Sequence, residues 1–112
     1  MQFGRRLREL RQARKMTLRD LAAKVGVGFT YLSKIENHKL EEGHSPSEKL
    51  IHKLAVELDA DEQELLFLAE KVPEVIRRRV MEQPNAFMAL AQLGDADLTD
   101  VLKHVQARIK KR

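Results

Sequence analysis

The sequence contains no cysteine. Disulfide bonds and thiolate metal sites are therefore excluded, and this composition is compatible with a reducing cytoplasm. No apolar run approaches the roughly 20 residues that span a bilayer. The opening stretch, MQFGRRLREL, lacks the apolar core of an export signal. We therefore expect a cytoplasmic protein that does not contact a membrane. With 112 residues, it has room for one domain and an appendage, but not for two independent cores.

Signatures of catalysis and metal binding are also missing. The sequence has no HExxH motif, no glycine-rich phosphate loop after a strand, and no serine nucleophile with a helper base. The four histidines are scattered, and His38 and His44 fall on a polar loop without paired carboxylates on a rigid element. We therefore expect no enzymatic activity, no metal ion and no cofactor.

Strand-like alternation and internal repeats are absent, and helical periodicity takes their place, most clearly between Thr17 and Glu36. Gly26 interrupts this segment where the end of a helix favours a left-handed residue. A second short helix, at 28–37, follows after a gap of about three residues. Two such short helices must cross steeply, which is the geometry of a helix-turn-helix. The alternative is an ordinary corner between two helices. The apolar face of the first helix comprises Leu18, Leu21, Ala22 and Val25.

The distribution of charge favours the helix-turn-helix. Residues 1–40 hold ten basic and three acidic residues, a net charge of +7, whereas residues 41–72 hold three basic and nine acidic residues, a net charge of −6. Residues 73–112 have a net charge of +3, which completes the total of +4. Neutralising phosphates requires positive charge to be concentrated in one region, and here that region contains the two crossing helices.

These features resemble a known family, the lambda-repressor-like, Xre-type regulators. The resemblance covers residues 3–68 and rests on LRELRQARKMTLRDLA, the glycine turn, YLSKIEN and SPSEKLIHKLAVELDADEQELL. It implies an all-α fold with a five-helix DNA-binding domain at 1–71, in which residues 28–36 form the recognition helix. Arg11 and Glu36 occupy the positions that are paired in this family. We therefore expect them to form a partly buried, structural ion pair rather than a base contact.

Capping signals set the expected helix bounds. Thr17 with Asp20 is typical of a capping box, and Ser45 followed by Pro46 predicts a helix with Ser45 as its N-cap and Pro46 at its first position. The polar stretch 37–45, which follows the recognition helix, is longer than the turn usual in the family. We expect the five helices at about residues 3–14, 18–25, 28–37, 46–58 and 62–71.

The exposed face of the recognition helix indicates how it would read DNA. Lys34 can donate to guanine, and Thr30 and Ser33 can bond base edges or phosphates. Phe29 has two interpretations, contact with a thymine methyl group or packing in a core or interface. Family members usually carry a small hydroxyl or amide side chain where this chain has Gly28. With the expected phosphate contacts added, the candidate DNA-binding residues are Thr17, Arg19, Gly28, Phe29, Thr30, Tyr31, Ser33, Lys34, Asn37 and Lys39.

Beyond the resemblance, residues 72–112 predict three more helices. We expect them at about 73–83, from 84 or 85 to 93, and at about 96–110. Gly94 is expected to close the second of them from a C′ position. The last helix carries a narrow apolar seam that a lone helix cannot bury. This seam could be covered by a second copy of the chain, or it could fold back onto the DNA-binding domain. We favour the second copy, because dimers of helix-turn-helix proteins occupy two half-sites about 34 Å apart. The candidate dimerisation residues are Phe87, Leu90, Leu98, Leu102, Val105 and Ile109.

We therefore expect a sequence-specific transcriptional regulator that binds double-stranded DNA. The favoured form is a repressor that binds a palindromic operator as a homodimer. The alternative is an antitoxin or anti-regulator whose C-terminal helices bind a partner protein, and DNA binding could coexist with that role. The operator sequence, the inducing signal and the sign of regulation stay open.

Overall fold

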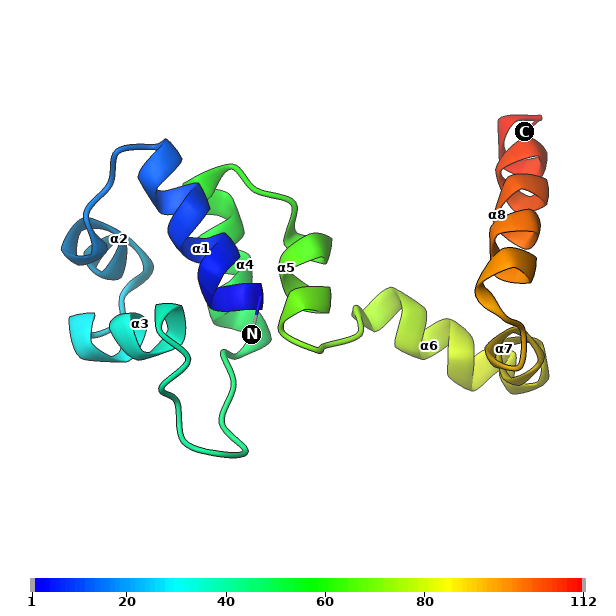
Figure 1. Cartoon of the computed structure of the whole chain (residues 1–112), viewed down its shortest axis with the longest axis horizontal. Helices are drawn as coiled ribbons and strands as arrows, with labels where there is room; N and C mark the ends of the chain where they lie inside the picture. Colours follow the sequence, from blue (N-terminus) through cyan, green and yellow to red (C-terminus); the bar gives the residue numbers. More distant parts are fainter. Residues whose placement is uncertain (1, 112) are drawn as a thin grey trace. The chain divides into compact units, whose positions relative to one another are not determined.

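The computed structural model describes residues 2–111, which form eight α-helices and no strand (Figure 1). The predicted all-α class is confirmed. Within this range, no helix is both long and apolar enough to cross a bilayer. The chain divides into two compact units, Met1–Pro73 and Glu74–Arg112. The helices are α1 (Gln2–Ala13), α2 (Leu18–Val25), α3 (Phe29–Glu36), α4 (Glu48–Leu58), α5 (Glu62–Leu68), α6 (Glu74–Glu82), α7 (Pro84–Ala91) and α8 (Asp95–Lys110).

The first unit closes around a single apolar core. Helix α1 packs against α3 and α5, α2 packs against α3 and α4, and α4 packs against α5. Each helix supplies residues three or four positions apart, so that one face is apolar and the other reaches solvent. The largest fully buried side chains are Phe3, Leu7, Leu21, Leu32, Ile35, Ile51, Leu54, Leu65, Val25 and Pro46.

The start of α4 differs from the prediction. Its N-cap is Ser47, not Ser45, and the Ser47 hydroxyl accepts from the backbone N–H of Leu50 at 3.1 Å. Pro46 therefore precedes the cap and is buried. An apolar residue at that position can pack toward the fourth residue of the helix, here the buried Ile51, as a hydrophobic staple. Burial of the proline ring thus selects the second of the two serines.

The second unit contains three helices but no interior. Helices α6 and α7 pack against each other, yet none of the residues from 74 to 111 is buried. Local pairs support these helices instead, such as Arg77 with Glu74 at 2.7 Å and Arg79 with Glu82 at 2.8 Å. Such exposed pairs each contribute only a few tenths of a kcal/mol. The unit therefore holds its helices mainly by local signals.

The position of Gly94 also corrects the prediction. Helix α7 ends at Ala91, and Gly94 is the N-cap of α8, with an extended conformation at φ −77° and ψ 174°. The chain beyond α7 tightens into a shorter turn, in which the N–H of Leu93 donates to the carbonyl oxygen of Leu90 at 3.1 Å. This turn satisfies a terminal carbonyl without a left-handed residue, so no C′ glycine is needed.

Candidate nucleic-acid interface

Helices α2 and α3 form the predicted bihelical unit, and caps fix both ends of α2. The Thr17 hydroxyl accepts from the N–H of Asp20 at 3.0 Å, and the Asp20 carboxylate accepts from the N–H of Thr17 at 3.3 Å. At the other end Gly26 has φ 74°, the left-handed conformation, and its N–H closes the helix on Ala22 and Ala23. Both capping predictions are confirmed. Three residues, 26–28, then lead directly into α3.

Helix α3 has one buried face and one face open to solvent. Leu32 and Ile35 are buried in the core. Thr30, Tyr31 and Lys34 are exposed on the remaining surface. The N-cap of α3 is Gly28, which has no side chain to cap the helix. The first N–H groups of α3 therefore receive no side-chain cap from Gly28 and are open to an acceptor from outside the protein.

An arginine and an aromatic ring connect the starts of α2 and α3. The guanidinium carbon of Arg19 lies 4.5 Å from the centre of the Phe29 ring. Phe29 is 40% exposed, so it lies at the surface and not in the core. A cation–π contact at an exposed site contributes about 0.5–1 kcal/mol. The contact places the charge of Arg19 next to the first turn of α3.

Arg11 and Glu36 form a two-pronged ion pair between α1 and the end of α3. Arg11 Nε lies 2.8 Å from Glu36 Oε2, and Arg11 Nη2 lies 3.0 Å from Oε1. Arg11 Nη1 also donates to the carbonyl oxygen of Met16 at 2.9 Å. Glu36 is the one charged residue buried in the described part of the chain. The hydrogen bond to Glu36 raises the pKa of Arg11, so the guanidinium stays charged at any physiological pH.

A second arginine of α1 holds the same end of α3. Arg8 Nε lies 3.4 Å from Glu36 Oε1, and Arg8 Nη2 donates to the side-chain oxygen of Asn37. The side-chain nitrogen of Asn37 donates in turn to the carbonyl oxygen of Ser33 at 2.9 Å. Both ends of the Asn37 side chain are thus engaged within the protein. Sequence reasoning missed Arg8, although its spacing of three from Arg11 places both on one face of α1.

Gly4 was also missed. A Cβ at this position would lie 2.5 Å from the carbonyl oxygen of Ile35 and 2.7 Å from that of Glu36. Glycine inside a helix costs roughly 1 kcal/mol relative to alanine. Here it lets α1 meet the backbone of α3 directly. A glycine within a predicted helix is the signal that could have indicated this approach.

The loop between α3 and α4 runs beside the exposed face of α3. His38 and Gly43 adopt positive φ, at 61° and 83°, and these turns bring the loop back beside the helix. The loop and α3 together enclose an open groove of about 480 Å³. Four candidate DNA-binding residues line it on the side of α3, namely Gly28, Thr30, Tyr31 and Lys34. Glu41 lines it on the side of the loop, together with Leu40 and His44.

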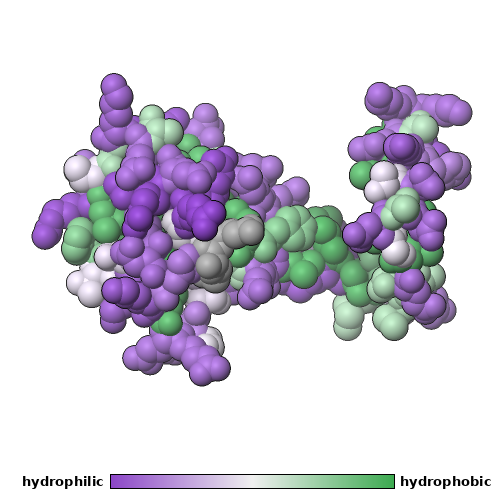
Figure 2. Space-filling view, in the orientation of Figure 1, coloured by the Kyte–Doolittle hydropathy of each residue, from purple (hydrophilic) through white to green (hydrophobic). Residues whose placement is uncertain are grey.

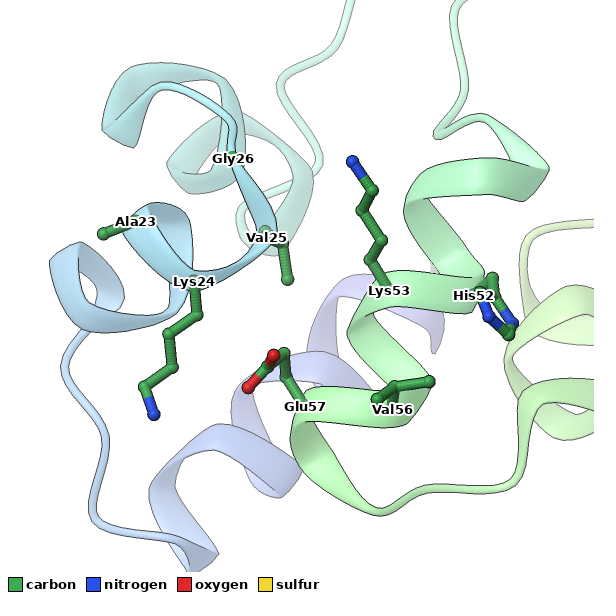
Figure 3. A pocket seen from close by; sticks show the side chains of 8 residues that line it. All are labelled: Ala23, Lys24, Val25, Gly26, His52, Lys53, Val56 and Glu57. Carbon is green, nitrogen blue, oxygen red and sulfur yellow. The ribbon is translucent and has the colours of Figure 1, made fainter.

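A separate pocket of about 350 Å³ lies between the end of α2 and α4 (Figure 3). Lys24 and Lys53 line it together with Glu57, which extends from α4 toward α2 in Figure 3. None of the candidate DNA-binding residues is among its lining residues. Within residues 2–111, no three His, Cys, Asp or Glu side chains are grouped as a metal site would require. The groove beside α3 is therefore the stronger functional candidate.

Most of the positive charge of residues 1–40 is accessible. Eight of its ten basic residues are exposed, and Figure 2 shows hydrophilic side chains over much of the visible face of this unit. The two half-buried ones are engaged within the protein. Arg11 pairs with Glu36 as described, and Arg6 bonds Glu64 at 3.2 Å, which raises the pKa of Arg6. The exposed cations are Arg5, Arg8, Arg14, Lys15, Arg19, Lys24, Lys34 and Lys39.

Residues 2–68 match a family profile described as a helix-turn-helix domain. The chain belongs to this family. Over 106 residues it is 41% identical to RghRB, an uncharacterized HTH-type transcriptional regulator of Bacillus subtilis (strain 168), a match that covers 92% of this chain and 71% of RghRB. The chain is thus a transcriptional regulator with a helix-turn-helix DNA-binding domain. The resemblance to lambda-repressor-like, Xre-type regulators is confirmed.

The solved structures that share this fold include two that contain SinR. One is SinR, described as the master regulator for biofilm formation, in complex with DNA; it is 33% identical, with a TM-score of 0.51 over 57% of this chain and 97% of that one. The other is a complex of SinR and SinI proteins, 23% identical, with a TM-score of 0.54 over 96% of this chain and 98% of that one. The second likeness concerns the fold alone.

Proposed function

We propose that this protein is a sequence-specific repressor that binds a palindromic operator as a homodimer. The proposal is carried by the two faces of α3, of which one is packed in the core and the other is exposed to solvent. Its apolar face is anchored by Leu32 and Ile35, and its C-terminal end is held by Arg8 and Arg11. A helix fixed in this way can present its other face to a major groove at low entropic cost.

The exposed residues of α3 and its neighbours have different roles in recognising DNA. Lys34 reads a guanine through O6 or N7, and Thr30 bonds a base edge or a phosphate. Arg19 contacts a phosphate from its position over Phe29, which lies where it can meet a thymine methyl group. Tyr31 and the other polar candidates position the protein on the backbone. These further contacts come from Thr17, Gly28, Ser33 and Lys39, whereas Asn37 holds the end of α3 through its bonds to Arg8 and Ser33.

The second unit, Glu74–Arg112, supplies the dimer contact. Leu98, Leu102, Val105 and Ile109 of α8 are 39%, 54%, 42% and 60% exposed. They recur at i, i+4, i+7 and i+11, and so form a stripe along one helix face. A second copy of the chain offers the same stripe, and a twofold arrangement buries both at once. Phe87 and Leu90, which are half-buried on α7, extend this surface.

Selection of bound duplexes from a random DNA pool by the full-length protein tests the proposal. We expect enriched sequences with an inverted repeat whose half-sites are about one helical turn, or ~34 Å, apart. Single half-sites without a partner would contradict the dimer, and a pool that stays random would contradict sequence-specific binding. Placing an enriched duplex over a promoter, in a reporter strain that expresses the protein, tests repression; increased transcription would contradict it.

A further inference from the structure

The groove beside α3 contains a charge that DNA binding does not require. Lys34 and Glu41 line this groove of about 480 Å³ together, and both also line a smaller adjoining hollow of about 210 Å³. Lys34 is on the helix that we place in the major groove, and Glu41 is on the loop that follows. A DNA strand that reaches Thr30 and Lys34 therefore passes close to the carboxylate of Glu41.

Backbone hydrogen bonds hold Glu41 in this position. The N–H of Lys39 donates to the carbonyl oxygen of Lys34 at 2.8 Å, which ties the start of the loop to α3. The N–H of His44 donates to the carbonyl oxygen of Glu41 at 2.9 Å, which makes a tight turn at the tip. Leu40, beside Glu41, is half-buried against the core. The Glu41 side chain is nevertheless 84% exposed, and its carboxylate lies 4.0 Å from His44 Nδ1.

A carboxylate at this place weakens the binding of any DNA that lies along the groove. Binding to DNA of arbitrary sequence comes almost entirely from attraction between cations and phosphates. A negative charge within a Debye length, about 8 Å at physiological salt, weakens that attraction directly. On the operator, hydrogen bonds to base edges add to the phosphate contacts, so the operator stays the favoured site. The same charge lowers the affinity for operator and non-operator DNA by a similar factor, because the repulsion depends on phosphates and not on bases.

We propose that Glu41 limits the affinity of this protein for DNA by repelling phosphates beside α3. This inference rests on the proposed function, because it requires α3 to face DNA. It assigns a role to the loop that is longer than the turn usual in the family. The chemistry involved is charge repulsion in the groove, so neutralising the carboxylate is sufficient to remove it.

The experiment compares Glu41→Gln with Glu70→Gln in the full-length protein. Both changes remove one negative charge from an exposed glutamate, but Glu70 follows α5 and does not line the groove. Binding to an enriched duplex and to a scrambled duplex is measured by fluorescence anisotropy over a range of salt concentrations. For Glu41→Gln we expect about three- to tenfold tighter binding to both duplexes at low salt. For Glu70→Gln we expect less than about twofold change on either duplex.

A charge reversal and the wild-type protein complete the test. Glu41→Lys should tighten binding to the scrambled duplex further and steepen its salt dependence by about one phosphate contact. Equal effects of Glu41→Gln and Glu70→Gln would overturn the proposal, because the effect would then be one of net charge alone. Weaker binding of Glu41→Gln to the enriched duplex would also overturn it, because the carboxylate would then accept a bond from a base. Wild-type protein that binds both duplexes equally would refute the proposed function, and the scrambled duplex would still report on Glu41.

Discussion

The two units of this protein carry similar helices but differ in what surrounds them. Helices α1–α5 share a core of fully buried side chains, whereas residues 74–111 contain no buried residue. Both units show good local signals for helices, including charged pairs and favourable residues at helix starts. Local signals thus suffice to define helices, but not to bury their apolar faces. The first unit buries its own apolar residues in one core, whereas the second leaves the apolar stripe of α8 exposed to solvent.

The largest expected effect on operator affinity comes from placing charge in that stripe. Leu102→Glu would strand an ionised group in an apolar contact, and we expect a monomer in sedimentation together with a folded first unit. Operator affinity should fall by about two orders of magnitude or more, because two linked half-site contacts become separate ones. Ala107→Glu adds the same charge at an exposed position on the opposite face of α8 and serves as the control. Wild-type protein that stays monomeric at tens of micromolar would assign the stripe to a different protein and favour the partner-binding alternative.

A change within the first unit should cost stability instead. Arg11→Met leaves the buried carboxylate of Glu36 without its two-pronged partner, and we expect a loss of ~3–5 kcal/mol in the free energy of unfolding. The double variant with Glu36→Leu should recover much of this loss, since it removes the uncompensated charge. Urea unfolding of both single variants and the double variant gives the coupling energy. Losses that simply add would show that the two groups act independently.

Glycine substitutions should have opposite effects in the two units. Gly4→Ala drives a Cβ to within 2.5 Å of a backbone carbonyl oxygen, and we expect a net loss of ~1–3 kcal/mol despite the better helix propensity. Gly94→Ser in the second unit enters open space at an N-cap and should gain a few tenths of a kcal/mol. Thermal unfolding of the two variants measures both effects. A neutral Gly4→Ala would mean that α1 can move away from α3 at little cost.

The contacts on α3 should separate base reading from backbone attraction. Lys34→Ala should cost ~1–3 kcal/mol on the operator and relax the preference at one base pair. Arg19→Ala should weaken binding to all sequences alike and lower the salt slope by about one. Lys24→Ala, at the other end of α2, is the control for charge alone. Anisotropy titrations on single-substitution duplexes measure these preferences, and an unchanged profile for Lys34→Ala would remove its role as a reader.

The sequence was informative wherever the signal is local. The capping box at Thr17, the left-handed Gly26 and the apolar periodicity of α1–α5 each depend on residues close together in the chain, and all are present in the structure. The prediction was wrong where the sequence offered two equally good helix starts. Ser45 and Ser47 can both cap a helix, and only the burial of Pro46 decides between them.

The candidate site was less accessible to sequence reasoning than the fold. Phe29 had two interpretations, and its exposed position under Arg19 became clear only from the packing of α2 against α3. The contacts of Gly4 and Arg8 with the end of α3 span about thirty residues of sequence. Contacts of that kind depend on how helices dock, which composition and periodicity do not specify.

The order of the two units along the chain has a consequence for synthesis. At about 5–20 residues per second, the ribosome needs a few seconds to add the residues that follow Pro73. Small helical domains fold in microseconds to milliseconds, so the self-contained unit can fold before the last helix emerges from the ribosome. The apolar stripe of α8 therefore emerges beside a core that has already closed, and it cannot compete for the residues of that core.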